Sequence, residues 1–151
     1  MKSKASIGGH PIHPMLIPFP LALWVTSFAA DVLFYFVRHP TLLVIAKFCL
    51  AAGCIAAVAA AIFGIIDWLG IPGGEVKKVA NWHARLNVVA LIVFAVSLFL
   101  RMGSYSDLVG RRLTIPFLLS LVGVILITIS GWLGGELVFR YGVGQTRDDN
   151  I

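Results

Sequence analysis

Residues 42–69 read LLVIAKFCLAAGCIAAVAAAIFGIIDWL and contain only two charged side chains, Lys47 and Asp67. This run exceeds the roughly 20 residues that a helix needs to cross a hydrocarbon core. Three further apolar runs reach the same length, at residues 16–37, 79–100 and 113–133. Apolar residues make up 59% of the chain and charged residues only 13%, too few to cover a water-facing surface. The sequence therefore predicts an all-α integral membrane protein, a four-helix bundle that runs up-down-up-down.

Prolines set the N-terminal segment apart from the four runs. Pro11, Pro14, Pro18 and Pro20 cannot all lie in one regular helix, because each lacks an amide donor and strains the preceding turn. We expect residues 1–15 to form an extended or kinked His-Pro strap across one end of the bundle. Residues 16–139 then form the four-helix domain, and residues 140–151 a polar tail. The sequence shows no convincing internal repeat.

Basic side chains indicate the orientation in the membrane. An even number of crossings places both termini on one side, where the basic residues are Lys2, Lys4, Lys77, Lys78, Arg85, Arg140 and Arg147. The other side has Arg38, Arg101, Arg111 and Arg112. By the positive-inside rule, this small excess places both termini in the cytoplasm. A net charge of +5 is modest for a chain of 151 residues and does not indicate nucleic-acid binding.

Four side chains that can bind a metal lie at the ends of the apolar runs. His10 and His13 precede the first run, Asp67 closes the second, and His83 opens the third. Even numbers of crossings separate them, so all four are expected at the same side of the bilayer. Imidazoles and a carboxylate gathered at a membrane edge are typical of a ligand shell. These four residues are the predicted metal or cofactor site.

Helical spacing indicates which side chains support this site. Small residues recur every four positions before Asp67, and this pattern favours close helix packing. Asp67 lies seven residues after Ala60, so it is expected on the same packed face of the helix. Asn87 follows His83 by one turn and is expected either to hold the second ring nitrogen of that histidine or to cap a neighbouring helix end. Glu136, near the end of the fourth run, is a further supporting candidate.

A second polar group is predicted deeper in the bundle. Asp31 lies near the far end of the first run, and Lys47 lies at similar depth in the second. We expect the two to form a structural ion pair, with Arg101 as a further cation within reach.

Several segments resemble a known family. Gly9-His10-Pro11-Ile12-His13-Pro14, followed by Ile17-Pro18-Phe19-Pro20, resembles the opening signature of a bacterial membrane family, domain of unknown function 2231. Further similar segments are Gly64-Ile65-Ile66-Asp67, Trp82-His83 with Asn87, and Gly134-Gly135-Glu136-Leu137-Val138. The resemblance implies a small four-helix protein of the bacterial inner membrane. Some members are joined to Rieske-type iron–sulfur domains, which implies a link to electron transfer. Cys49 and Cys54, both in one predicted helix, cannot supply such a centre's two-Cys, two-His shell.

Three functions fit these features. The first is electron transfer by haem b, with axial imidazoles from His10 or His13 and from His83. The second is a zinc or iron ion ligated by His10, His13, His83 and Asp67. The third is a structural or assembly subunit in which the polar cluster only locks the end of the bundle. The resemblance favours a metal- or haem-binding role in electron transfer. No nucleotide motif or nucleophile–base pair indicates an ordinary enzyme, and the partners that remain open are a redox protein or a second copy of the chain.

Overall fold

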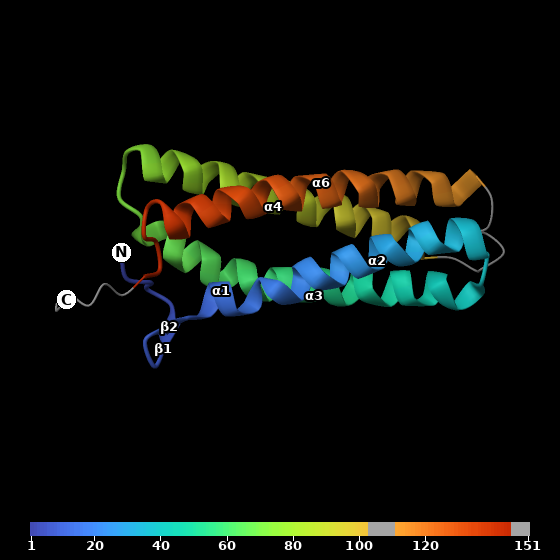
Figure 1. The fold of residues 1–151 in the computed structure, drawn as a ribbon, viewed down its shortest axis with the longest axis horizontal. Helices are drawn as coiled ribbons and strands as arrows, with labels where there is room; N and C mark the ends of the chain where they lie inside the picture. Colours follow the sequence, from blue (N-terminus) through green and yellow to red (C-terminus); the bar gives the residue numbers. More distant parts are fainter. Residues whose placement is uncertain (103–110, 146–151) are drawn as a thin grey trace.

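The computed structural model describes residues 1–102 and 111–145 and has four long helices in one bundle (Figure 1). In chain order the elements are β1 (Ser6–Ile7), β2 (His10–Pro11), α1 (Ile12–Leu16), α2 (Pro18–Val37), α3 (Pro40–Gly70), α4 (Glu75–Leu100) and α6 (Arg111–Phe139). The N-terminus, the end of α6 and the connection from α3 to α4 lie at the same end of the bundle (Figure 1). The predicted all-α bundle with up-down-up-down helices is therefore confirmed.

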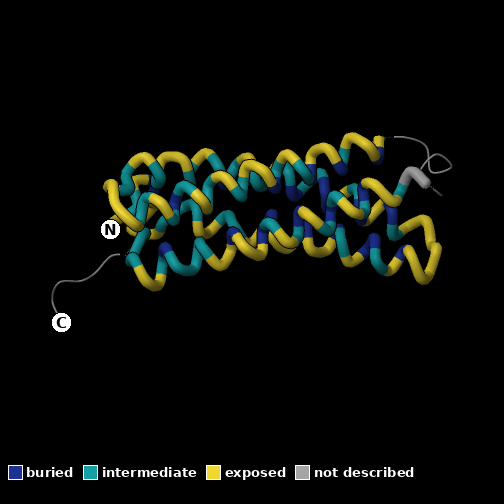
Figure 2. The backbone as a smooth tube through the Cα atoms, turned by 90° about the horizontal axis from the view of Figure 1, so that it is seen from above, coloured by how far each residue is buried: buried dark blue, intermediate teal, exposed yellow. Residues whose placement is uncertain are grey.

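The helices have the length and the surface of membrane spans. Four segments are long and apolar enough to cross a bilayer: Ile12–Val37, Pro40–Gly70, Glu75–Leu100 and Leu113–Phe139. At 1.5 Å per residue, even the shorter ones reach about 39 Å, more than a hydrocarbon core of roughly 30 Å. Exposed residues line the outside of the bundle (Figure 2), and Phe48, Ile55 and Phe99 are each at least 70% exposed. Such a surface is suited to contact with lipid.

The N-terminal segment is more helical than its prolines predict. α1 begins at residue 12, so His13 lies in a helix and not on an extended strap. Pro14 occupies the first turn of α1, where an amide hydrogen has no partner within any helix. Pro18 and Pro20 lack further amide donors, and α1 ends at Leu16, one residue before Ile17. The Ile17 N–H nevertheless bonds to the His13 carbonyl at 3.1 Å. The non-helical part is thus limited to residues 1–11, which include the short hairpin β1–β2.

The bundle consists of a duplicated helical hairpin. The Ser27 hydroxyl donates to the carbonyl of Ala46 at 2.8 Å, and the Ser97 hydroxyl donates to the carbonyl of Pro116 at 2.9 Å. Each bond joins residues 19 positions apart, and the second pair lies 70 residues after the first. The hairpin of α1, α2 and α3 therefore corresponds to the hairpin of α4 and α6. The expectation that the chain has no internal repeat is wrong.

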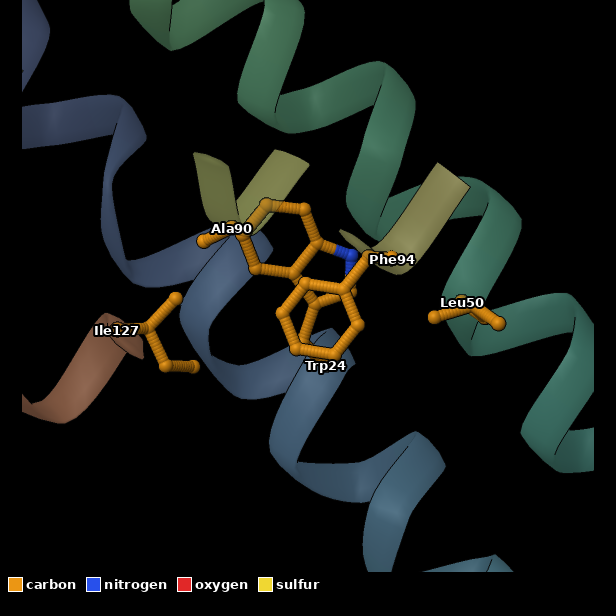
Figure 3. Packing of buried hydrophobic residues seen from close by; sticks show 5 residues of the cluster. All are labelled: Trp24, Leu50, Ala90, Phe94 and Ile127. Atoms are coloured by element: carbon orange, nitrogen blue, oxygen red, sulfur yellow. The ribbon is translucent and has the colours of Figure 1, made fainter. Parts of the chain in front are cut away.

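The two hairpins are related by an approximate two-fold rotation. α2 corresponds to α4 and α3 to α6, so the contact of α2 with α6 is equivalent to the contact of α4 with α3, and both are present. Residues near such an axis touch their own equivalents. Trp24 stacks on Phe94, 70 residues later, with ring centroids 4.3 Å apart, and this stack is the centre of the buried apolar cluster (Figure 3). The axis runs along the bundle, because both hairpins begin at the same end (Figure 1).

A second self-equivalent contact corrects the predicted ion pair. Arg101 donates from both terminal nitrogens to the two carboxylate oxygens of Asp31, at 2.6 and 2.7 Å. These residues are also 70 positions apart, and they are only 2% and 6% exposed. Arg101, and not the predicted Lys47, is thus the partner of Asp31. The planar guanidinium suits a buried bidentate pair better than a lysine ammonium does.

Candidate functional site: a histidine pair between two hairpins

His13 and His83 lie against each other where the two hairpins meet. Their ring centroids are 6.5 Å apart and their ring planes are inclined by 85°. His13 comes from α1 and His83 from the first half of α4, at equivalent positions of the repeat. Both side chains are half-buried. The fold thus brings together two of the four predicted ligands, one from each hairpin.

Each imidazole is fixed by a main-chain carbonyl of its own hairpin. His13 Nδ1 lies 2.7 Å from the Ala60 oxygen, and His83 Nδ1 lies 2.8 Å from the Ser130 oxygen, in both cases 47 residues further along. A carbonyl can only accept a hydrogen bond, so Nδ1 carries the proton in each neutral ring and Nε2 keeps a lone pair. Histidines that bind metals are held in this way, with the second ring nitrogen donating to a carbonyl or carboxylate.

A glycine one turn after each carbonyl makes room for the ring. A Cβ atom at Gly64 would lie 2.7 Å from His13 Cε1, and one at Gly134 would lie 3.1 Å from His83 Cε1. Both distances are shorter than ordinary van der Waals contact. A helical carbonyl has a second lone pair, and the missing side chain one turn later leaves it accessible to the imidazole. The combination of histidine, carbonyl and glycine therefore occurs twice in the molecule.

His83 has more partners than His13. The Ser130 hydroxyl lies 3.1 Å from His83 Nδ1 and donates to the His83 carbonyl at 3.3 Å. The Asn87 amide lies 3.1 Å from His83 Nε2 and donates to the same carbonyl at 3.0 Å. The equivalent positions in the first hairpin are Ala60 and Ile17, which have no polar side-chain atoms. Asn87 thus contacts His83 at Nε2, the nitrogen that is free of the Ser130 carbonyl, whereas the prediction placed it on the nitrogen that does not bind a metal.

Asp67 anchors the N-terminal segment. Its Oδ1 accepts hydrogen bonds from the Ser3 hydroxyl at 2.7 Å, from the Lys4 amide at 2.8 Å and from the Ala5 amide at 3.1 Å. The Ala5 carbonyl in turn accepts from the Ile12 amide at 2.9 Å, at the start of α1. Asp67 therefore acts on the histidine pair indirectly, because it holds the segment that leads into α1.

The other two candidates have different surroundings. His10 is exposed in β2, which projects from the end of the bundle (Figure 1). Glu136 forms an ion pair with Arg140 at 2.6 Å, and this hydrogen bond raises the pKa of the exposed Arg140 guanidinium. Within residues 1–102 and 111–145, no three His, Cys, Asp or Glu side chains are grouped so that they could hold a metal ion. The described residues bring two imidazoles together, without a third ligand.

Sequence reasoning missed the carbonyl anchors and the hydroxyl of Ser130. One signal could have revealed them: His13 precedes Gly64 by 51 residues, and His83 precedes Gly134 by the same interval. Two identical long-range spacings of the same residue types indicate a duplication, and a duplication predicts that equivalent glycines receive equivalent rings.

Comparison with known proteins agrees with the membrane bundle. A family model described as "Predicted membrane protein (DUF2231)" matches residues 9–147, which include both histidines and all four long helices. This match confirms the resemblance seen in the sequence. No curated protein and no solved structure matches the chain. The description of the family gives a membrane location and no activity.

Proposed function

We propose that this chain, which belongs to the DUF2231 family of predicted membrane proteins, holds haem b between His13 and His83 and transfers electrons. The observation that carries the proposal is the contact of the two imidazoles, each fixed through Nδ1 by a carbonyl of its own hairpin. In this arrangement both Nε2 atoms are acceptors, which is the state that a metal requires.

The number of available ligands favours haem over a bare ion. A structural zinc site takes four protein ligands and a catalytic one takes three. The residues that the structure describes offer no group of three or more such side chains. Haem brings four nitrogen ligands of its own, so His13 and His83 would be sufficient to hold it.

The spacing of the rings also suits one shared metal atom. An imidazole nitrogen binds a metal at roughly 2.0 to 2.1 Å, so two histidines that would hold one metal atom must have ring centroids within about 6 Å of each other. The observed separation of 6.5 Å is close to this value. The two-fold relation between the hairpins would let each hairpin supply one equivalent histidine to a shared group.

The residues of the chain have definite tasks in this function. Bound haem supplies one-electron redox chemistry, and the protein sets the ligands and their surroundings. The carbonyls of Ala60 and Ser130 orient the rings and would make them better electron donors to a metal, because each accepts a hydrogen bond from the ring Nδ1–H. The two histidines belong to α1 and to the first half of α4, toward the end of the bundle where the chain begins (Figure 1), so a redox partner protein would approach from that side.

A structural role is the second candidate, and Asn87 favours it. Because the Asn87 amide bonds to His83 Nε2, both nitrogens of this ring have partners within the protein. In this role the histidine pair only joins the two hairpins near one end, as the ion pair of Asp31 and Arg101 joins them near the other. Haem binding would then be absent from the purified protein.

The test is spectroscopy of the detergent-purified protein together with elemental analysis. We expect a Soret band and a reduced α-band, one iron per chain, and loss of both bands in His13→Ala and in His83→Ala. His10→Ala is the matched control, because this histidine is exposed in β2 and its removal should leave the spectrum unchanged.

Each other outcome has a clear meaning. Stoichiometric zinc or iron without a Soret band would replace haem by a metal ion at the same two histidines. A colourless, metal-free protein that also binds no added haem would leave only the structural role. Loss of the spectrum in His10→Ala, with the other two variants unaffected, would move the site to the N-terminal hairpin.

A further inference from the structure

One polar residue beside the histidine pair has no counterpart in the other hairpin. Asn87 lies one turn after His83, and the equivalent residue one turn after His13 is Ile17. The Asn87 amide nitrogen lies 3.1 Å from His83 Nε2 and 3.0 Å from the His83 carbonyl. An amide has two N–H groups, so Asn87 donates to both acceptors at once.

Asn87 and a metal would compete for the same lone pair, that of His83 Nε2. The His83 Nδ1 proton is donated to the Ser130 carbonyl, so the lone pair for a metal is on Nε2. That lone pair can accept a hydrogen bond from Asn87 or bind iron, and not both. A metal held by His83 would therefore require the Asn87 amide to release Nε2. At His13 the structure has Ile17 in this position, so a metal held there would displace no amide.

From this asymmetry we infer that Asn87 is an internal partner of His83 that haem must displace. The competition from the Asn87 amide lowers the affinity of the protein for haem and makes haem binding reversible. The inference rests on the proposed haem site and names the residue that regulates it. In the protein without haem, the Asn87 amide bonds to Nε2, so this nitrogen is not left unsatisfied in an apolar bundle. Asn87 is thus a positioning residue, and it stabilises the protein while no haem is bound.

The test uses two single variants, each of which gives one hairpin the residue that the other hairpin has at the equivalent position. Asn87→Ile gives the second hairpin the residue of the first, and Ile17→Asn gives the first hairpin the amide of the second. Transfer of haem from each variant to an excess of an apo-globin measures the dissociation rate, and titration with haem measures the affinity. Loss of one neutral hydrogen bond to the competing amide should raise the affinity of Asn87→Ile about threefold to tenfold. Ile17→Asn should change affinity and release in the opposite direction. Asn87→Leu, which keeps the shape of the amide side chain, provides a second variant in case isoleucine packs poorly.

The results separate this inference from the proposed function. Tighter binding and slower release in Asn87→Ile or Asn87→Leu support the inference. Unchanged or weaker haem binding in both variants, in a folded protein that binds haem in its natural form, would overturn it, because Asn87 would then only orient His83. Absence of haem binding in the natural protein and in every variant would instead refute the proposed function.

Discussion

Gly64→Ala should perturb the candidate site more than any other single methyl group. The new Cβ atom would lie 2.7 Å from His13 Cε1 and 2.8 Å from His13 Nδ1, so the ring must retreat by about 0.7 Å to reach ordinary contact. That movement can lengthen the Nδ1 bond to the Ala60 carbonyl from 2.7 Å to about 3.4 Å, where an N–H···O bond is weak at best. The lost bond costs about 1 to 3 kcal/mol and the overpacking a similar amount, while alanine returns about 1 kcal/mol of helix propensity. Because His13 is only half-buried, we expect a net destabilisation near the low end, about 2 kcal/mol.

A series of three glycines supplies the measurement and its controls. At Gly134 the added Cβ would lie 3.1 Å from the His83 ring, so Gly134→Ala should cost less than Gly64→Ala. At Gly131 nothing lies within 4 Å, so Gly131→Ala should be neutral or slightly stabilising. The free energy of unfolding is measured by circular dichroism during titration of the micelles with a denaturing detergent, and haem affinity is measured in parallel. Equal effects at the three positions, or the largest effect at Gly131, would refute the contact geometry of the histidines.

Three further predictions concern the supports of the bundle. Arg101→Leu leaves the Asp31 carboxylate buried without a partner and should lower the free energy of unfolding by about 3 to 5 kcal/mol, whereas the double variant with Asp31→Leu should regain most of this loss in the same assay. Asp67→Ala removes three hydrogen bonds to the N-terminal segment. Limited trypsin digestion should therefore cleave the first residues at least about tenfold faster, while the helix content is unchanged. Equal cleavage rates would show that Asp67 does not hold this segment in place. Ser97→Ala should destabilise by about 1 kcal/mol more than Ser27→Ala in thermal unfolding, because the Ser97 hydroxyl also bonds to Arg101; a larger loss at Ser27 would argue against the assigned bonds.

The sequence was sufficient to predict the helical bundle because hydropathy fixes the spans. Lipid-facing positions need only be apolar, so the run at residues 42–69 predicted most of α3, which extends to Pro40–Gly70. The errors lie at helix ends. α1 begins earlier than expected because Pro14 falls in a first turn, where its missing N–H has no partner to lose.

The histidine pair could be predicted only in part. Membrane topology placed His13 and His83 on one side, and this was correct, since their rings lie against each other. Topology predicts on which side of the membrane a residue lies, but it does not predict which side chains on that side are in contact. Asp67 meets main-chain amides of residues close to the N-terminus, and a main-chain partner leaves no signal in side-chain chemistry.

The internal repeat was missed for a related physical reason. Apolar residues on the lipid side can be exchanged without changing the fold, so little of the duplication persists there as identity. It persists where contacts are directional: at His13 and His83, at Ser27 and Ser97, and at the glycines beneath the rings. Recognition of these spacings would have predicted which residues meet on the axis.

Low-temperature electron paramagnetic resonance of the oxidised protein addresses the pairing of His13 and His83 on one iron most directly. The account predicts a low-spin ferric signal of haem with two imidazole ligands, which converts to a high-spin signal or disappears when either histidine is replaced by alanine. A protein without any haem signal, or one whose signal survives both substitutions, would contradict it.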